Sequence, residues 1–479
     1  MAAYLGTLPQ ADTALQRLQV LFKRQQSASR TGVASSLAER QNRLDRLRTL
    51  LITHEASLIE AISSDFGNRS ADETRLLEIG LILNAIRHTR KHLRGWMKPE
   101  RRPVDIAFQP ARAWIRYEPL GVIGIIAPWN YPLFLSLGPL VDAFAAGNRA
   151  MIKPSELTPR FSDLLARLIS DAYDEAEATV ITGGVEIAHA FSSLPFDHLI
   201  FTGSTSVGRK VMQAAAAHLT PVTLELGGKS PVIVCDDYPV VKAARSIAFG
   251  KFLNAGQTCI APDYALVPKD KVETFARAVI AHARTFYPTL ARNPDYTSIV
   301  SPRHYHRLVR AIDEARAAGA TVLSHDEAGT STSCKLAPTV VVGAPNEGLL
   351  LTEEIFGPVL PVIGYETLDE ALDYINARDR PLALYAFSGK TSTLERILDR
   401  SISGGVTLNG TLLHAAQDGL AFGGVGPSGM GGYHGHDGFR RFSHARSVFK
   451  VGFVNVFEKL GPPWGNLARQ VGRLLAKRH

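Results

Sequence analysis

The feature that most constrains the fold is an alternation of short apolar segments with amphipathic ones in the middle of the chain. Four apolar segments occur there, at 121–127, 149–152, 178–181 and 198–201. Stretches with helical periodicity, such as 161–173 and 207–218, lie between them. Short continuous apolar runs are typical of strands buried on both faces of a parallel sheet. The alternation therefore predicts a doubly wound α/β domain.

A second α/β region is expected between about 224 and 413. Its predicted strands are 231–234, 264–267, 340–342 and 359–364, with a long helix near 271–285. Upstream, 36–66 and 73–97 have helical periodicity, and Ser36 and Glu39 form a capping-box pattern. Two further segments, 104–118 and 448–456, are expected to be extended.

The chain has 479 residues, too many for one small core. We divide it into seven segments: a helical part of a cofactor domain (1–103), strands of a bridging arm (104–118), a Rossmann-like domain (119–224), a catalytic domain (225–415), a glycine-rich loop that returns to the cofactor domain (416–446), a second arm strand (447–456) and a C-terminal tail (457–479).

Cysteine content and hydropathy favour a cytoplasmic location. The three cysteines, Cys235, Cys259 and Cys334, are too few for a disulfide framework. The chain has no apolar run long enough to span a membrane, and residues 1–10 do not resemble a secretory signal. The net charge of +8 comes from basic residues spread along the chain, and no nucleic-acid motif accompanies them, so we expect no nucleic-acid partner.

The C-terminal segment 466–478 predicts a basic amphipathic helix. Its leucines and valine lie at helical spacing beside arginine and lysine. Such a helix can bind weakly to an anionic membrane surface. Because it is only about three turns long and marginal on its own, we favour docking on its own protein or on a partner subunit.

Cys259 is the first candidate catalytic residue. It follows an Ala-Gly approach and precedes a proline, in the segment 254–262. A thiolate in such a loop can add to a carbonyl, and a backbone N–H can bind the resulting oxyanion. From this segment alone, a small buried hydrophobic role for the thiol is as probable. Cys235 and Cys334 lack such a loop, and we expect them to be structural.

Glu225 and Asn130 are two further candidates. Glu225 stands between leucines, where burial would raise its pKa toward that of a general base; an ordinary ion pair with Lys229 is equally compatible. Asn130 lies between Pro128 and Pro132, directly after a predicted strand, and can serve as an oxyanion donor. Its amide could equally bond its own turn.

Two strand-to-helix junctions suggest a nucleotide site. Lys153 and Glu156 follow a predicted strand at the position where α/β sheets bind nucleotides, and both can reach a ribose. The turn 201–208 can present a helix N-terminus to a pyrophosphate. It lacks the Gly-x-Gly-x-x-Gly pattern, so by itself it is weak support.

Taken together and in order, these motifs resemble the aldehyde dehydrogenase superfamily. The resemblance also includes 353–358 (EEIFGP) and 422–429 (FGGVGPSG), and it extends from about 36 to 456. Within the superfamily the chain is most similar to the class 3 branch, especially to the coniferyl-aldehyde dehydrogenase group, in 254–264, 407–418 and 426–436. Two residues depart from the usual pattern: Ala421 stands where relatives have proline, and Gly410 where the group tends to have aspartate.

The resemblance implies a role for each of these residues. Cys259 would be the nucleophile, Glu225 the general base and Asn130 part of the oxyanion hole. The cofactor NAD, or NADP, would be bound by Ile126, Trp129, Lys153, Glu156, Gly203, Ser204, Val207, Leu226, Gly227, Glu354 and Phe356. No metal would be involved.

The implied reaction is oxidation of a small-molecule aldehyde to the acid through a thiohemiacetal and a thioester on Cys259. The substrate would be coniferyl or a related aromatic aldehyde, or alternatively a medium-chain or long-chain aliphatic aldehyde. Glu156 would repel a 2′-phosphate and so favours NAD, although relatives often accept both cofactors. A thiol esterase, a CoA-acylating enzyme and a non-catalytic protein are less compatible with the motif set. Class 3 relatives form dimers, so we expect a homodimer.

Overall fold

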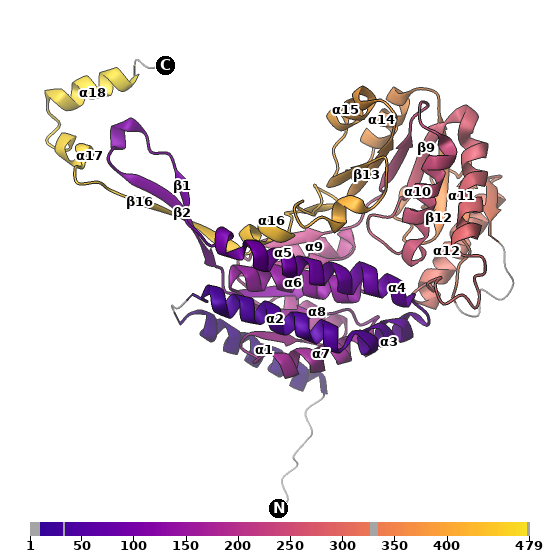
Figure 1. Ribbon diagram of the computed structural model, residues 1–479, viewed down its shortest axis with the longest axis horizontal. Coiled ribbons are helices and arrows are strands. Elements are labelled where there is room, and N and C mark those ends of the chain that lie inside the picture. The colour runs from indigo at the N-terminus through magenta and orange to yellow at the C-terminus, as the bar shows by residue number, and fades with distance from the viewer. Residues whose placement is uncertain (1–9, 32–33, 326–333, 477–479) are drawn as a thin grey trace, which may run out of the picture.

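The computed structural model describes residues 10–31, 34–325 and 334–476, and within these the chain forms three sheets (Figure 1). The first has six strands in the order β15 (Gly429–Met430), β7 (Val222–Glu225), β6 (His198–Thr202), β3 (Val122–Ile126), β4 (Arg149–Lys153) and β5 (Ala178–Val180). Only β15 is antiparallel to its neighbour. The strand order reverses at β3, which makes the carboxyl ends of β3 and β6 the expected ligand-binding edge.

Helices cover both faces of this sheet, as expected for a doubly wound fold. Successive residues of β3 point to opposite faces of the sheet. Val122 packs in the core with α1, α8 and α9, whereas Ile123 packs in the core with α2, α5, α6 and α7. The helices are α1 (Gln10–Ser29), α2 (Leu37–Thr53), α3 (Glu55–Phe66), α4 (Ala71–Thr74), the π-helix η1 (Arg75–Ile79), α5 (Gly80–Trp96), α6 (Pro132–Ala146), α7 (Pro159–Ala172), α8 (Val185–Ser192), α9 (Thr205–Ala216) and α16 (Gly435–Arg441). The predicted helices and the Ser36–Glu39 capping box are confirmed, whereas α1 was missed.

The second sheet has seven strands, all parallel except the edge strand β10. Their order is β10 (Thr321–Ser324), β11 (Thr339–Val342), β12 (Val359–Tyr365), β9 (Tyr264–Pro268), β8 (Pro231–Val234), β13 (Ala383–Phe387) and β14 (Gly405–Leu408). It is accompanied by α10 (Val240–Phe252), η3 (Leu253–Gly256), η4 (Lys269–Lys271), α11 (Val272–Phe286), α12 (Pro302–Ala317), α13 (Leu349–Thr352), α14 (Leu368–Asn376), α15 (Thr391–Arg400) and η6 (Leu413–Ala416). The four strands predicted here are confirmed; β10, β13 and β14 were not predicted.

The third sheet forms an arm that extends from the body (Figure 1), in the order β1 (Glu100–Arg102), β2 (Arg112–Pro119), β16 (Ser443–Lys450). Two expectations are corrected here. The 104–118 segment is not extended throughout, since a 3-10 turn, η2 (Ile106–Phe108), precedes β2. The strand expected at 448–456 begins earlier, at Ser443, and ends at Lys450. Further along, Asn455 caps a short helix, α17 (Val456–Leu460), so the end of the expected strand is not extended.

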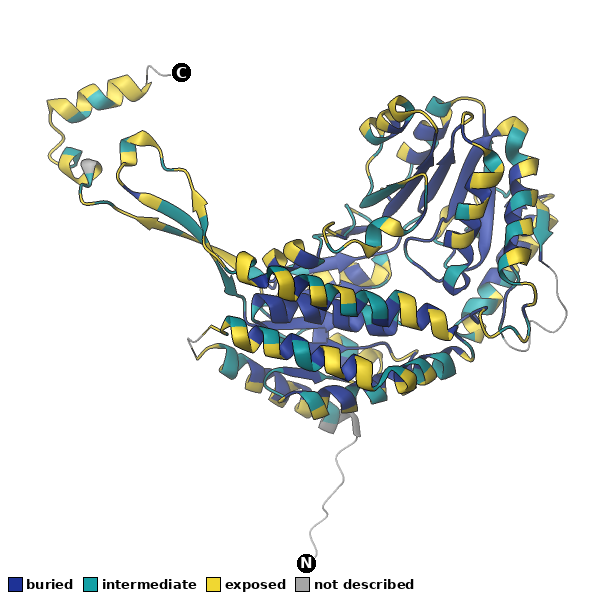
Figure 2. Cartoon of the chain, in the orientation of Figure 1, coloured by how far each residue is buried: buried dark blue, intermediate teal, exposed yellow. Residues whose placement is uncertain are grey.

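The C-terminal helix α18 (Asn466–Ala476) forms where an amphipathic helix was predicted, but it does not dock on its own chain. None of its described residues is buried, and Figure 2 shows it exposed at the end of the arm. Leu474 is 66% exposed. Docking on the same chain is therefore wrong as a prediction for the described part of the tail. Among the described helices, none is both long and apolar enough to cross a bilayer.

Candidate active site

A cleft of about 560 Å³ lies between the ligand-binding edge of the six-stranded sheet and the loops of the seven-stranded one. Ten of the residues singled out in the sequence line it: Trp129, Asn130, Gly203, Ser204, Glu225, Leu226, Gly227, Cys259, Glu354 and Phe356. The other four, Ile126, Lys153, Glu156 and Val207, do not line it. The cleft thus gathers residues from segments that are far apart in the sequence.

The loop of Cys259 has an unusual backbone that presents the sulfur to the cleft. In η3, Asn254 and Ala255 have left-handed φ values of 49° and 50°, and Gly256 follows at 74°. A Cβ on Gly256 would lie 2.3 Å from the Gly357 carbonyl oxygen, so only glycine fits this approach. Burial, assisted by the nearby carboxylates Glu354 and Glu225, raises the pKa of Cys259 to about 12. The thiol is therefore protonated at rest.

Glu225 ends β7 and is 2% exposed. In the described part of the chain, neither carboxylate oxygen has a hydrogen-bond partner. The alternative ion pair with Lys229 is excluded, because Lys229 pairs with Asp263 and donates to the Leu350 carbonyl at 2.8 Å. Burial raises the pKa of Glu225 well above its ordinary value, against a smaller effect of Arg441. Such a carboxyl is suited to taking up a proton.

Asn130 is 3% exposed and is hydrogen-bonded to the loop that carries Cys259. Its Nδ2 donates to the carbonyl oxygen of Gln257 at 3.1 Å. The backbone carbonyl oxygen of Asn130 accepts a hydrogen bond from Asn254 Nδ2 at 3.0 Å. An amide nitrogen has two hydrogens, and one of them suffices for the Gln257 bond. The amide is thus fixed relative to the sulfur.

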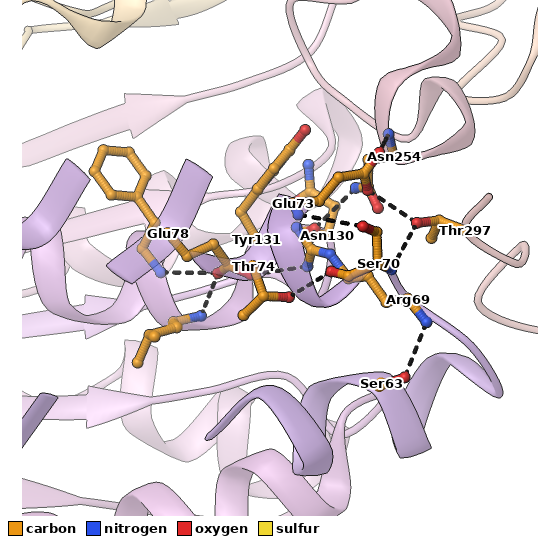
Figure 3. A network of polar contacts seen from close by, with 12 residues as sticks. Ser63, Arg69, Ser70, Glu73, Thr74, Glu78, Asn130, Tyr131, Asn254 and Thr297 are labelled. Atoms are coloured by element: carbon orange, nitrogen blue, oxygen red, sulfur yellow. Dashed lines mark hydrogen bonds and ion pairs between the residues drawn. The ribbon is translucent and has the colours of Figure 1, made fainter. Parts of the chain in front are cut away.

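A buried polar network lies behind Asn130, and none of its members was predicted (Figure 3). Arg69 donates to the Asn130 carbonyl oxygen at 3.1 Å and pairs with Glu78 at 2.8 Å. Glu78 accepts two backbone N–H groups at the start of α6, from Leu133 and Phe134, at 2.8 and 3.0 Å.

Glu73 extends the same network to the cysteine loop. One of its oxygens accepts the backbone N–H of Asn254 at 2.9 Å, and the other accepts the Thr297 hydroxyl at 2.9 Å. The network therefore connects the segment before α6 with the segment before Cys259. Its polar residues carry no motif, and only their burial in three dimensions identifies them.

The opposite wall of the cleft is formed by Glu354 and Phe356. Oε2 of Glu354 lies where a Cβ on residue 227 would be, 1.9 Å from that position, so the absence of a side chain on Gly227 lets Glu354 approach this closely. Burial raises the pKa of Glu354 to about 8, and its Oε1 has no hydrogen-bond partner among the described residues. Phe356 packs edge-on against Trp129 with 5.4 Å between ring centroids.

The remaining predicted nucleotide contacts lie beside the cleft rather than in it. Lys153 and Ile126 are cross-strand neighbours at the carboxyl ends of β4 and β3. Lys153 Nζ donates to the Pro154 carbonyl at 2.7 Å and lies 3.6 Å from Glu156. Val207, in the first turn of α9, is 44% exposed.

Seven further residues line the cleft. Two of them, His304 and Arg307, were not singled out in the sequence, and the other five lie in motifs that were: Pro128, Thr202, Thr205, Ser206 and Glu353. His304 packs edge-on against Trp129 at 5.4 Å, and Arg307 donates to the Ile355 carbonyl at 2.6 Å. Both lie one turn apart on α12, so helical spacing was the only signal. No cluster of His, Cys, Asp and Glu in the described ranges could hold a metal ion.

Comparison with known proteins shows which family the chain resembles. The model of the aldehyde dehydrogenase family matches residues 3–448. A Pseudomonas aeruginosa protein named probable coniferyl aldehyde dehydrogenase is 50% identical, with 97% of each chain covered. A rat dimeric NADP-preferring aldehyde dehydrogenase is 39% identical, with 90% of this chain and 94% of the relative covered.

Among solved structures, the substrate-bound state of Staphylococcus aureus AldH is similar, with a TM-score of 0.90 and 37% identity. The alignment covers 95% of this chain and 99% of that one.

Proposed function

The chain belongs to the aldehyde dehydrogenase family, and on that premise we propose that Cys259, Glu225 and Asn130 carry out its NAD(P)-dependent oxidation of an aldehyde to the acid. The observation that supports these roles is their convergence on one cleft from three separate segments. The three side chains are a sulfur nucleophile, an unpartnered carboxyl and a fixed amide donor, which are the groups that this reaction needs.

In the first step, the Cys259 thiol loses its proton to water in the cleft, and the resulting thiolate adds to the aldehyde carbon. The carbonyl oxygen becomes an oxyanion, which accepts hydrogen bonds from Asn130 Nδ2 and from the Cys259 backbone N–H. Because the network of Arg69, Glu73 and Glu78 fixes Asn130 relative to the loop, these donors need little reorganisation. Donors held in this way stabilise the transition state more than mobile ones.

In the second step, Glu225 draws a proton from a water that attacks the thioester carbon. The carbon–sulfur bond breaks, the acid leaves and Cys259 is regenerated. The raised pKa of Glu225 gives its carboxylate the basicity for this transfer, and its unpartnered oxygens leave it free to bind the water.

The cleft fits a nicotinamide dinucleotide. The glycine approach at Gly227 and the unpartnered buried oxygen of Glu354 leave a hydrogen-bond acceptor for a ribose hydroxyl. Glu354 and Phe356 would hold the nicotinamide ribose, and Lys153 with Glu156 the adenosine ribose. Gly203, Ser204 and Val207 would lie by the pyrophosphate and adenine, and Ile126 and Trp129 would line the cofactor site beside Leu226 and Gly227. When bound, the cofactor accepts a hydride from the substrate carbon. Glu156 favours NAD over NADP, because a 2′-phosphate would be repelled.

We propose coniferyl aldehyde or a related aromatic aldehyde as the substrate, which rests on the 50% identical relative. Aliphatic aldehydes of medium or long chain are the second candidate. We also propose a homodimer formed through the arm, since the exposed edges of β1 and β16 are suited to pairing, and a cytoplasmic location with at most weak contact of α18 with a membrane surface.

The experiment that tests the substrate assignment measures NADH and NADPH formation by the purified chain with coniferyl aldehyde, benzaldehyde and decanal in parallel. The highest kcat/KM is expected for coniferyl aldehyde. A higher kcat/KM for decanal would retain the enzyme class and reject the aromatic substrate. No turnover with any of the three would contradict the proposal.

A further inference from the structure

We propose that a cavity at the base of the arm binds a small molecule that carries a diphosphate group. The side chains that would hold this group are four arginines: Arg43, Arg116, Arg149 and Arg446. The site goes beyond the proposed oxidation of an aldehyde, because none of the described residues that line the cavity belongs to the cleft of Cys259.

The cavity has a free volume of about 390 Å³ and lies where the arm joins the body (Figure 1). Gly121 and Arg149 are at the amino ends of β3 and β4, opposite to the edge at which the cofactor cleft opens. Arg116 and Glu118 belong to β2 of the arm, and the end of α1 with residues 34–35 forms a third side. A volume of this size is typical of sites for small ligands.

The charged side chains that line the cavity are unbalanced. Four are arginines and one is a glutamate: Arg43, Arg116, Arg149, Arg446 and Glu118. Arg43 is buried and Arg149 is half-buried, whereas Arg116 and Arg446 are exposed. Cations are therefore present both deep in the cavity and at its mouth, and an anion with two linked phosphates can contact both.

At the mouth, two guanidinium groups share the carboxylate of Glu118. Arg116 Nε lies 3.3 Å and Arg446 Nη1 lies 3.4 Å from the same oxygen, Oε1. Both distances are longer than the roughly 2.7–2.9 Å of a strong charge-assisted hydrogen bond. One carboxylate cannot neutralise two cations, so positive charge at the mouth is left for a ligand.

Deeper in the cavity, the guanidinium of Arg149 is hydrogen-bonded to neutral groups. It donates to the backbone carbonyl oxygens of Ala28, at 3.1 Å, and of Ala176. Burial and, as a smaller effect, the charge of Arg43 lower the pKa of Arg149, because desolvation and a like charge both disfavour the cation. A phosphate beside Arg149 would offset both effects.

Further cations lie behind the same wall. Arg43 pairs with Glu177 at 3.0 Å, but Glu177 also pairs with Arg46 at 2.8 Å. Arg40 lies against Gly147, where a Cβ would be 2.7 Å from its Cζ, and burial with the charge of Arg43 lowers the pKa of Arg40 to about 10. Guanidinium groups thus outnumber the carboxylates that pair with them here, and their planar forks match the oxygens of a phosphate.

Other carboxylates near this end of the sheet are engaged away from the cavity. Asp174 and Glu175 pair with Arg24 at 3.0 and 2.8 Å, and neither lines the cavity. Glu39 accepts the backbone N–H of Ser36 at 2.6 Å in the capping box. These acids therefore leave the excess positive charge of the cavity in place.

A ligand in this cavity would also join two parts of the chain. Arg116 and Arg446 belong to strands of the arm, whereas Arg43 and Arg149 belong to α2 and β4 of the body. A diphosphate that contacts both pairs stabilises the folded chain by mass action, so the Tm should rise with its concentration.

The test titrates inorganic pyrophosphate into the full chain by calorimetry, with NAD at saturation so that the cofactor cleft is occupied. The double variant Arg116→Gln with Arg446→Gln removes both cations at the mouth, and Glu118→Gln removes the lining carboxylate. Arg277→Gln is the matched control, since Arg277 is an exposed arginine that pairs with Glu273 on α11, outside the cavity. A parallel titration with ADP distinguishes a nucleotide from a free diphosphate.

We expect one pyrophosphate per chain, with a Kd that increases as NaCl is added. The Kd should rise about tenfold or more in the double variant, fall about fivefold in Glu118→Gln and stay unchanged in Arg277→Gln. Misfolding cannot tighten binding, so the result with Glu118→Gln separates an effect of charge from a loss of structure.

Three results would overturn the site: no binding of pyrophosphate, binding that NAD displaces, or an equal Kd in the unchanged chain and in the double variant. Tighter binding of ADP than of pyrophosphate would support the site and identify the ligand as a nucleotide. Weaker binding of ADP would support the site for a diphosphate without a nucleoside. Aldehyde oxidation by the unchanged chain is measured separately and tests the proposed function alone.

Discussion

Arg69 and Glu78 form an ion pair at 2.8 Å in which neither side chain is exposed to solvent. The guanidinium also lies over the rings of Phe66 and Tyr131, and it donates to the backbone carbonyl of Asn130. Two buried charges that satisfy each other can be neutral for stability, but one left alone is costly. Removing one charge of this pair would therefore disturb Asn130, the proposed oxyanion donor, whose backbone Arg69 contacts.

Replacing Arg69 alone should destabilise the chain strongly. Arg69→Met leaves the Glu78 carboxylate buried without its cation, and we expect a loss of about 3–5 kcal/mol in the free energy of unfolding. Denaturant unfolding measures it. The double variant Arg69→Met with Glu78→Gln should recover most of the loss. Equal stability of the single and double variants would mean that the pair carries no charge coupling.

Removing the amide of Asn130 should slow the chemical step. Asn130→Ala deletes a donor to the developing oxyanion, for which a fall in kcat of about 10²–10³-fold is typical. Binding of NAD, measured by calorimetry, should change little, because the cofactor is held by other residues of the cleft. If kcat remained within a few-fold of the unchanged value, the oxyanion would have to be held elsewhere.

Replacing Glu225 with glutamine should stabilise the chain at neutral and alkaline pH. The folded-state pKa of Glu225 is raised by burial, so folding disfavours its ionised form. The contribution of the Glu225 carboxyl to the free energy of unfolding is fully present below the unfolded-state pKa of about 4.3. It is lost as pH rises through the folded-state pKa. We therefore expect Tm of Glu225→Gln to exceed that of the unchanged chain increasingly as pH rises from 5 to about 8, and to match it near pH 4. A Tm difference independent of pH would contradict an unpaired buried carboxyl.

Neutralising Glu156 should relax the choice of cofactor. Its carboxylate lies 3.6 Å from Lys153 and is about half exposed. Removing one repulsive charge near a 2′-phosphate in water is worth about 1 kcal/mol, which corresponds to about a fivefold rise in kcat/KM for NADP relative to NAD in Glu156→Gln. Initial rates with both cofactors measure the ratio. An unaltered ratio would place the 2′ position away from Glu156.

Much of the fold could be predicted because its strands and helices carry local patterns. Strands β3, β8 and β12 are continuous apolar runs, β4 and β6 are apolar at their centres, and α2 begins with a capping box. The missed elements differ in this respect: β13 (Ala383–Phe387) is a continuous buried apolar run that carries the same signal, whereas β14 and α1 do not. β14 is short and only partly buried, and α1 reveals its apolar face only through Leu18, Leu21 and Phe22, which pack on the sheet.

The residues of the candidate site also fall into those that the sequence predicts and those that it does not. Cys259, Glu225 and Asn130 lie in segments whose glycines and prolines mark them in the sequence. Arg69, Glu73 and Glu78 do not, since the site residues that they contact are more than fifty residues away and their importance depends on burial.

The central claim is that Cys259 forms the thioester and Glu225 is needed to release it. The most direct measurement mixes Glu225→Gln rapidly with NAD and aldehyde and follows NADH formation before the steady state, with Cys259→Ala as the control. We predict a burst of about one NADH per active site followed by slow turnover in Glu225→Gln, and no NADH from Cys259→Ala, which should still bind NAD. Loss of the burst in Glu225→Gln, or turnover by Cys259→Ala, would contradict these roles.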